Sequence, residues 1–320
     1  MKNDLVVKDN ALINASYNLE VTEQRLILLS IIRARETGQG ISSDSKLEIH
    51  ASDYASRFDV TKEAAYSALK NAVNNLFERK FSFKEIHKDS NKEIVVKSRW
   101  VSRIAYIDDL ATLEVTFAPD VVPLITRLEK HFTSYQLKQV AQLTSKYAIR
   151  LYEFLIAWRE VGKTPIISLS EFREKLGLDI SEYQKMVNFK SRVLEPAIKQ
   201  INELTDIYVK YEQYKTGRSI SGLSFAFKHK KADSPPTDIG KDPNTIDLFS
   251  KLSDSQRHLF ANKLSELPEM SIYSQGTESY PQFAVRIAEM LQNPEKLKEL
   301  YPHLKKVGYT QSNKKDVVNG

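Results

Sequence analysis

The chain has 320 residues with a formal net charge of +6, and 41% of them are hydrophobic and 28% charged, which is typical of a soluble globular protein with two ordinary domains and an extension. It contains no cysteine, which excludes disulfides, thiolate zinc sites, iron–sulfur clusters and thiol catalysis. Because it also has no run of about 18 apolar residues and no apolar signal-peptide core, we expect a cytoplasmic protein that does not enter a membrane.

The first part of the chain predicts a helix, a short strand, two more helices and a β-hairpin. Apolar periodicity indicates the helices Arg25–Gly38, Ser52–Phe58 and Ala64–Phe81, and the strand KLEIHA lies between the first two. Alternating apolar residues in FSFKEIH and EIVVKSRWVSRIAYI predict two strands that turn around Asp89–Asn91. This order of elements is that of a winged helix, a helix-turn-helix extended by a β-wing.

The same order of elements returns about 120 residues later. Helical patterns cover Arg150–Gly162, Ser170–Leu176 and Tyr183–Asn202, and the short strand TPIISL follows the first of them. The segments IYVKYEQY and ISGLSFAFK then predict a hairpin that turns at Thr216 and Gly217. We therefore predict an α+β fold made of two tandem winged-helix domains related by pseudo-twofold symmetry.

The predicted domains are a first winged helix in residues 1–130, a second in residues 131–231, and a linker with a helical C-terminal tail in residues 232–320. The linker is indicated by KKADSPPTDIGKDPNT, which is rich in Pro, Asp and Gly. Helical patterns follow in IDLFSKLSDSQRHLFANKLSEL and YPQFAVRIAEMLQNPEKLKELYPHL, and the final TQSNKKDVVNG is typical of a disordered end.

The positive charge is concentrated in the second predicted domain. Residues 1–130 carry 19 Lys or Arg against 19 Asp or Glu, residues 131–231 carry 17 against 10, and residues 232–320 carry 11 against 12. A localised basic surface is the electrostatic footprint of a nucleic-acid-binding protein. An anionic membrane surface is the weaker alternative, because no basic amphipathic anchor helix stands out.

The helix Tyr183–Asn202 separates apolar from polar side chains when it is wound at about 100° per residue. The side predicted to face the core carries Val187, Leu194, Ala197, Ile198 and Ile201, and the opposite side carries Lys185, Asn188, Arg192 and Lys199. Pro196 lacks a backbone donor and disfavours a helical Glu195, so we expect a kink or a restart there. The alternative is an ordinary surface helix with solvated lysines.

In a winged helix the N-terminal part of this helix enters the major groove, where Lys or Arg can bind guanine and Asn can pair with adenine. Lys185, Asn188 and Arg192 occupy that part, whereas Lys190 is expected to reach a phosphate by extending its side chain. Two cations flank the hairpin turn and are expected to reach a phosphate or the minor groove, with ordinary solvation as the alternative. The predicted DNA-binding residues of this domain are Lys185, Asn188, Lys190, Arg192, Lys199, Lys215 and Arg218.

The corresponding helix of the first domain has a mixed outer face. We therefore place the phosphate contacts of that domain on its long hairpin, at Lys97, Arg99 and Arg103. Trp100 is expected to be packed rather than stacked on a base. Near-neutral charge predicts that this domain binds DNA more weakly or also makes a protein contact.

Enzyme signatures are missing from the sequence. There is no G-x-x-x-x-G-K-[ST] or G-x-G-x-x-G phosphate motif, and the six histidines include no H-E-x-x-H and no His-x-His pair. An initiator that nicks DNA needs a metal held by closely spaced histidines beside a tyrosine nucleophile, and none of the fifteen tyrosines has such a neighbour in sequence. We expect no catalytic residue, no metal site and no cofactor, and hence no enzymatic activity.

Three segments carry a resemblance to a known family. NASYNLEVTEQRLILLSII (Asn14–Ile32), LTSKYAIRLYEFLIAW (Leu143–Trp158) and FKSRVLEPAIKQINELTDIYVKYE (Phe189–Glu212) resemble the Rep_3 type of plasmid replication initiator, particularly those of small Acinetobacter-like plasmids. The likeness covers about residues 5–230. It implies a non-enzymatic protein whose monomer binds direct repeats (iterons) in double-stranded origin DNA, with the second domain contacting bases and the first mainly the backbone.

The resemblance also implies partners. Dimers would form through the first domain, in equilibrium with monomers, and would repress the initiator's own gene or pair origins to limit plasmid copy number. The bound initiator would help to open the origin and recruit the host initiator ATPase and the replicative helicase. A transcriptional repressor with the same fold is the alternative. For the monomer–dimer switch, we hypothesise that apolar surface in Leu110–Leu128, which joins the two modules, repacks between the two states.

Overall fold

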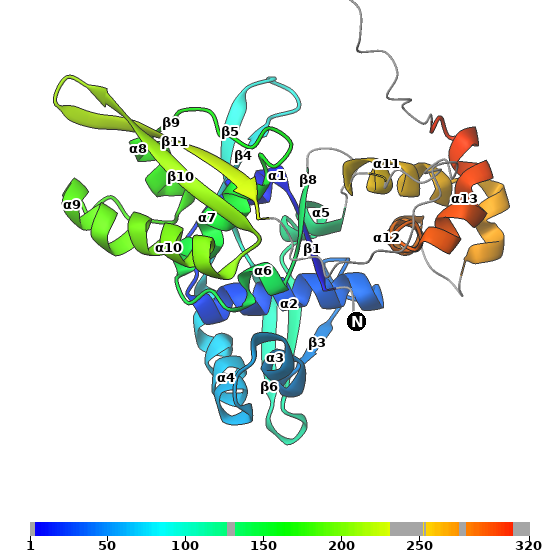
Figure 1. Ribbon diagram of the computed structural model, residues 1–320. Coiled ribbons are helices and arrows are strands. Elements are labelled where there is room, and N and C mark those ends of the chain that lie inside the picture. The colour runs from blue at the N-terminus through cyan, green and yellow to red at the C-terminus, as the bar shows by residue number, and fades with distance from the viewer. Residues whose placement is uncertain (1–3, 127–131, 231–251, 253, 275–279, 310–320) are drawn as a thin grey trace, which may run out of the picture. The chain divides into compact units, whose positions relative to one another are not determined.

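The computed structural model describes residues 4–126, 132–230, 252, 254–274 and 280–309 (Figure 1). They belong to two compact units, one made of the chain up to residue 230 and the other of the helices that follow residue 252. The first unit contains two winged-helix modules, as the sequence predicts. No helix among the described residues is long and apolar enough to span a bilayer.

The first winged-helix module is built on α2, Val21–Thr37. This helix ends at Gly38, whose φ of 69° is a left-handed conformation that glycine adopts without strain. Two more helices and a three-stranded antiparallel sheet of order β3-β7-β6 complete the module. These elements are β3 Leu47–His50, α3 Ala51–Phe58, α4 Lys62–Glu78, β6 Val101–Ile107 and β7 Thr112–Phe117, with the short η1 Asp108–Leu110 between the last two strands.

The hairpin predicted as the wing of this module is not the wing. The hairpin around Asp89–Asn91 exists as β4, Lys80–Ile86, and β5, Glu93–Arg99, but it forms a separate sheet with β2. The predicted long strand is broken at Trp100, which is 0% exposed and packs edge-on against Tyr17. Burial of this indole turns the chain from one sheet into the next, so that β6 and β7 form the wing. The expectation that Trp100 is packed is confirmed.

The second winged-helix module repeats the plan in residues 146–229. Its sheet has the order β10-β11-β9, and the hairpin β10–β11 is the predicted wing, which turns through Gly217 at a φ of 62°. A chain of helical turns leads into that hairpin. The elements are α7 Lys146–Ile156, β9 Ile167–Ser168, α8 Leu169–Lys175, α9 Met186–Phe189, η2 Lys190–Leu194, α10 Glu195–Leu204, β10 Ile207–Thr216 and β11 Ser219–His229.

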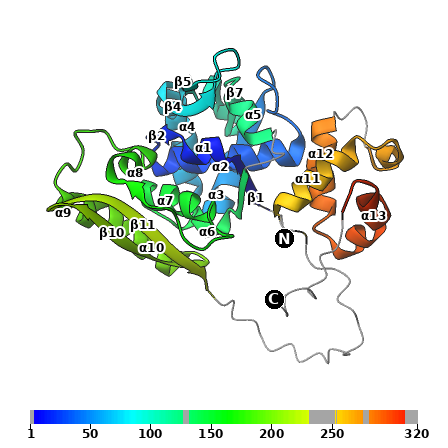
Figure 2. The same cartoon turned by 90° about the horizontal axis from the view of Figure 1, so that it is seen from above.

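The N-terminal segment joins the two modules. Its strand β1, Leu5–Asp9, pairs antiparallel with β8, Phe132–Gln136, and β2, Ser16–Tyr17, pairs with β4. Figure 2 shows α1, Asn10–Asn14, between the elements of the two modules. The short helices α5, Val121–Thr126, and α6, Lys138–Ala141, flank β8 in sequence. Buried apolar residues of both modules form one continuous cluster, so the two modules share a core.

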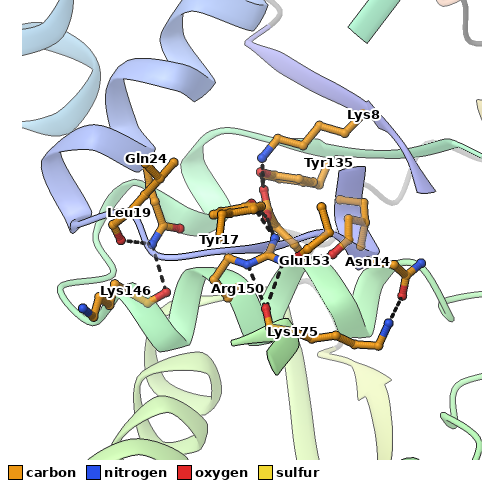
Figure 3. Close-up of polar contacts among 12 residues, drawn as sticks. Lys8, Asn14, Tyr17, Leu19, Gln24, Tyr135, Lys146, Arg150, Glu153 and Lys175 are labelled. Carbon is orange, nitrogen blue, oxygen red and sulfur yellow. Dashed lines mark hydrogen bonds and ion pairs between the residues drawn. The ribbon is translucent and has the colours of Figure 1, made fainter. Parts of the chain in front are cut away.

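A buried ionic network lies at this joint (Figure 3). The Lys8 ammonium is 2.6 Å from Glu153 Oε1, and Tyr135 donates to the same oxygen at 2.5 Å. Arg150 Nη1 donates to Glu153 Oε2 at 3.0 Å, and Tyr17 donates to that oxygen at 3.3 Å. Because Lys8 and Tyr17 come from the N-terminal segment while Arg150 and Glu153 come from α7, the network ties the second module to the start of the chain.

Arg150 is the centre of this network. Its Nη2 donates to the backbone carbonyls of Ile13, Ala15 and Lys175 at 3.1, 2.8 and 3.0 Å, and its guanidinium lies 3.8 Å from the centre of the Tyr17 ring. Burial alone would raise the pKa of Glu153, but the adjacent charges of Lys8 and Arg150 outweigh that effect and hold the pKa below its ordinary value. Glu153 is therefore ionised at neutral pH.

The C-terminal unit is helical, as the sequence predicts for the tail. It comprises α11 Asp254–Ser265, η3 Pro268–Tyr273, α12 Tyr280–Met290 and α13 Pro294–Lys306. Phe260, Leu264, Met270, Ile287 and Leu300 are buried in a core of its own. The predicted linker after Lys230 and the predicted disordered end at residues 310–320 lie outside the described residues.

The segment Leu110–Leu128 differs from our hypothesis of an apolar surface between the modules. Its residues 112–117 form β7, where Leu113, Val115 and Phe117 are buried in the core of the first module. Leu110 alone among its large apolar residues is an exposed side chain in the part of the segment that the structure describes. The repacking hypothesis would therefore require disruption of a wing strand.

Candidate nucleic-acid interface

The predicted recognition helix is continuous from α9 through η2 to α10, but its middle turn is a π-helix. The restart expected at Pro196 is not seen, because the helix passes from the π turn directly into α10, which carries the proline in its first turn. Glu195, which was expected to disfavour helical geometry, keeps helical angles, φ −67° and ψ −42°. The wider π turn, Lys190–Leu194, directly precedes the proline, and such turns are often found at functional sites.

The π turn also changes which side chains face the core. Val187 was predicted to face the core, but it is 76% exposed, and Phe189 is buried in its place. The extra residue in the turn shifts the first helical turn by about 100° relative to α10, which a uniform helical wheel does not allow for. The other predicted core positions hold, because Leu194, Ala197 and Ile201 are buried and Ile198 is half-buried.

The polar residues predicted for the outer face are exposed. Lys185, Asn188, Arg192 and Lys199 all lie on the solvent side. Lys185 and Arg192 have no ion-pair partner among the described residues, whereas Lys199 lies 4.0 Å from Glu203. The N-terminal part of the helix thus presents unneutralised positive charge together with one amide.

Lys190 is half-buried at the edge of this face. Its ammonium lies 6.0 Å from the centre of the Tyr211 ring on β10, a cation–π distance that places the charge beside the hairpin. Burial raises the pKa of the Tyr211 hydroxyl, so this tyrosine stays neutral. Lys190 therefore sits between the recognition helix and the wing.

The two predicted wing cations are at the tip of the β10–β11 hairpin. Lys215 and Arg218 are exposed on either side of the Thr216–Gly217 turn, and Thr216 Oγ1 donates to Ser221 Oγ at 3.0 Å across the turn. Figures 1 and 2 show that the hairpin tip and α9 project on the same side of the module. The helix face and the basic tip therefore lie on the same side of the module.

Arg173 on α8 fixes the start of the recognition helix. Its Nη1 donates to the Tyr183 carbonyl at 3.1 Å, its Nη2 donates to the Glu182 carbonyl, and its guanidinium lies 5.2 Å from the centre of the Phe189 ring. Tyr183 has a φ of 44°, which costs a non-glycine residue energy and needs such support. Sequence reasoning missed this positioning residue, because its partners are backbone carbonyls of a loop.

The same turn borders a groove of about 520 Å³ between α8 and α9. Most of its lining is apolar, and it includes Leu169, Leu178, Ile180, Met186 and Phe189. Hydrogen bonds from Ser181 hold the pKa of Asp179 below its ordinary value, so this carboxylate caps the loop in its ionised form. The loop before α9 is thus internally braced.

The first module presents its cations differently. Its wing ends at Asp108 and Asp109, and Lys70 of α4 pairs with Asp108 at 3.2 Å. Lys97 and Arg99 lie on β5, where the register puts Lys80 opposite Arg99 on the same face of the sheet. Sequence reasoning did not place Lys80 among the candidate residues. Phe81 and Phe83 share one face of an alternating strand, so Lys80 lies on the opposite face, and this alternation is the signal that could have identified it.

These three cations line a groove of about 530 Å³ together with Ser98 and Ser102. Arg99 is anchored there, because it donates to the Phe77 carbonyl at 2.7 Å and lies 3.2 Å from Glu78. Lys97 has no ion-pair partner in the part of the chain that the structure describes. The groove therefore carries positive charge that attracts an anion.

Arg103 lies on β6 and is separate from the other two predicted cations of this module. It pairs with Glu114 on β7, and Lys46 lies 3.6 Å from the same carboxylate. The Arg103 hydrogen bond lowers the pKa of Glu114, which therefore stays ionised and neutralises part of this charge. Arg103 is a weaker candidate for an anion contact than Lys97.

No group of three or more His, Asp or Glu side chains is arranged to bind a metal within the described ranges. The candidate surfaces are a helix face and a hairpin tip in the second module and a basic groove in the first. Such surfaces bind the phosphates and base edges of a duplex.

Comparisons with known proteins agree with this architecture. Residues 5–156 match a family described as initiator replication protein, WH1, and residues 168–227 match one described as initiator Rep protein, WH2. A replication initiation protein of Escherichia coli is 26% identical over 226 residues, which are 69% of this chain and 68% of that protein.

Two solved structures are also similar. The Pi initiator protein, crystallised in complex with iteron DNA, superposes with a TM-score of 0.54 at 24% identity and covers 72% of this chain and 99% of its own. The WH1 domain of MSBI1.176, a replication protein isolated from a multiple sclerosis patient, is 59% identical, covers 40% of this chain and 97% of its own, and has a TM-score of 0.33.

Proposed function

Because the chain belongs to the Rep_3 family of replication initiators, we propose that it starts plasmid replication by binding direct repeats (iterons) in double-stranded origin DNA. The observation that carries this proposal is the exposed, unneutralised N-terminal face of the recognition helix beside the basic tip of the second wing. A bare cationic surface of this kind exchanges counterions for DNA phosphates. The iteron complex of the Pi initiator, a protein of similar fold, supports the choice of ligand.

The second module makes the base contacts in this proposal. The first turns of the recognition helix enter the major groove, where Lys185 and Arg192 can bind guanine and Asn188 can pair with adenine. Lys190, next to Tyr211, and Lys199, about two and a half turns further along the helix, contact phosphates. The two wing-tip cations reach the backbone or the minor groove beside the helix.

The first module makes backbone contacts. In this proposal a phosphate binds in the groove lined by Lys80, Lys97 and Arg99, because these cations supply both charge and hydrogen-bond donors. Arg103 contributes less, since Glu114 already neutralises part of its charge. We retain residues 1–130 and 131–231 as the two functional domains, which share one core.

Binding as a monomer is part of the proposal. Direct repeats have no twofold axis, so they suit a monomer, whereas a twofold dimer prefers inverted half-sites. The dimer would then act as an autorepressor at its own promoter. The DNA-bound monomer would assist origin opening in the cytoplasm and recruit the host initiator ATPase and the replicative helicase, without a cofactor or catalytic residue of its own.

The test is binding of the purified chain to three duplexes: one direct repeat from its own plasmid origin, an inverted repeat from its promoter, and a scrambled sequence. Titrations at several salt concentrations are combined with a measurement of the mass of each complex. We expect the monomer to bind the direct repeat and the dimer to prefer the inverted one. Binding of a dimer to the inverted repeat alone would indicate a transcriptional repressor, and equal, salt-sensitive binding to all three would refute sequence-specific initiation.

A further inference from the structure

Val187 occupies an unusual position for a valine. It lies in the first turn of α9, directly between Met186, which is half-buried, and Asn188, which is exposed. Its side chain is 76% exposed. A single exposed apolar residue needs no explanation by itself, but this one lies within the helix face that presents Lys185, Asn188 and Arg192, and a β-branched residue is not favoured in a helix for its own sake.

The position of Val187 is fixed by the surrounding structure. Arg173 holds the preceding loop through the carbonyls of Glu182 and Tyr183, and Phe189 anchors the same helical turn in the core. With α9 held on both sides, residues 187 and 188 cannot rotate inward without extracting Phe189. Val187 is therefore a preorganised apolar contact point on a polar surface.

The chemistry of the major groove restricts what such a contact point can bind. Base edges there offer hydrogen-bond donors and acceptors, and the 5-methyl group of thymine is the apolar feature among them. A valine has no donor or acceptor, so it gains nothing from a phosphate or from guanine O6 and N7. The residues at the start of a recognition helix are those that meet base edges.

We propose that Val187 is a specificity-determining residue that packs against the 5-methyl group of a thymine in the iteron. The proposal rests on the proposed function, because it requires the recognition helix to lie in the major groove. The partner of Val187 is DNA rather than an apolar protein surface, because positive charge and an amide lie beside it. The thymine lies next to the bases contacted by Asn188, since the two side chains are neighbours on one helical turn.

Deoxyuridine is the probe that tests this contact, since it lacks only the methyl group of thymine. Each thymine of the iteron duplex is replaced singly by deoxyuridine, and binding is measured for the full chain, for Val187→Ala and for Val161→Ala. Val161 is a second exposed valine, 68% exposed and outside the recognition helix, and serves as the matched control. Thermal unfolding of each variant checks that the fold is unchanged.

We expect one thymine position at which loss of the methyl group lowers the affinity of the wild-type chain and of Val161→Ala about fourfold. This factor corresponds to the free energy gained by removing one methyl group from water. Val187→Ala should bind the unmodified iteron more weakly and show no further loss at that position, because the methyl group then has no partner. The loss at other thymine positions should be the same in all three proteins.

Three results would overturn the inference. If wild-type binding prefers the iteron over scrambled DNA but every thymine tolerates deoxyuridine equally in wild type and Val187→Ala, then Val187 reads no methyl group although the proposed function stands. If Val187→Ala instead changes the mass of the free protein and leaves DNA binding intact, the exposed valine is a contact between copies of the chain. Absence of any preference for the iteron would refute the proposed function and this inference together.

Discussion

Replacing Glu153 by glutamine should destabilise the winged-helix unit strongly. Each carboxylate oxygen of Glu153 accepts from two donors: Oε1 from Lys8 and Tyr135, and Oε2 from Arg150 and Tyr17. A glutamine amide keeps one oxygen and replaces the other by an NH₂ group, so either orientation points a donor at Lys8 or at Arg150. Neither cation can accept a hydrogen bond, and both are buried without their counter-charge.

The expected loss follows from this geometry. Removing one partner of a buried ion pair costs about 3–5 kcal/mol, because the remaining charge stays uncompensated. A typical domain has only about 5–15 kcal/mol of stability. Glu153→Gln should therefore lower the free energy of unfolding by a large fraction of the total. Lys8→Met combined with Glu153→Gln should cost less than the sum of the single changes, since the amide NH₂ can then face the Tyr135 hydroxyl.

Urea unfolding followed by tryptophan fluorescence measures this effect. The two tryptophans of the chain, Trp100 and Trp158, both lie in the winged-helix unit, so their emission does not report on the C-terminal helices. Glu160→Gln changes an exposed glutamate just beyond α7 and is the matched control. A loss for Glu153→Gln no greater than that of the control would refute the conclusion that the network stabilises the joint.

The same network predicts a pH dependence. The pKa of Glu153 is lower in the folded chain than the ordinary glutamate value of about 4.3. The ionised carboxylate therefore contributes stability that is fully present above that value and is lost as the pH falls through the lower, folded pKa. The stability difference between wild type and Glu153→Gln should shrink in acid, and a difference that is constant from pH 7 to pH 3 would contradict the assignment of charge.

Three further predictions concern DNA binding. Arg192→Ala should cost about 1–3 kcal/mol in binding free energy and relax the preference at one base pair if Arg192 reads a guanine; a uniform loss on all sequences would make it a phosphate contact instead. Lys215→Ala should weaken binding to specific and scrambled DNA alike and lower the slope of log K against log salt by about one unit. An unchanged slope would show that the wing tip does not contact DNA. Lys97→Ala should reduce affinity more than Arg103→Ala, because Glu114 already neutralises part of the Arg103 charge. Equal losses at Lys97 and Arg103 would argue against the basic groove. Filter binding measures all four variants.

Local patterns were enough to predict the repeated winged-helix plan. The helices and the second hairpin follow from periodicities that each segment carries by itself, such as the alternation in β10 and β11. The exposed placement of Lys185 and Arg192 follows from the same periodicity. These features need no information from distant parts of the chain.

The features that local patterns missed all depend on longer-range packing or on irregular backbone. A uniform helical wheel placed Val187 inside, because the π turn at Lys190–Leu194 is not encoded by apolar spacing. The wrong wing was predicted because the burial of Trp100 against Tyr17 interrupts an otherwise continuous alternating segment. Lys8 and Glu153 are separated by 145 residues in the sequence, so nothing local indicates that they meet.

The two modules share a fold but carry opposite charges at the tips of their wings. The wing of the second module ends in Lys215 and Arg218, whereas the wing of the first ends in Asp108 and Asp109, which phosphates would repel. Three candidate cations of the first module, Lys80, Lys97 and Arg99, instead lie on the additional β4–β5 hairpin. The shared core and the Glu153 network join both modules in one unit. In the proposed complex, where the basic wing and the basic groove contact the same duplex, the helical repeat of the DNA must match their spacing. Insertion of half a helical turn, about five base pairs, between the base-specific part of the iteron and its flank should therefore remove the contribution of Lys97 to affinity while leaving that of Arg192 unchanged.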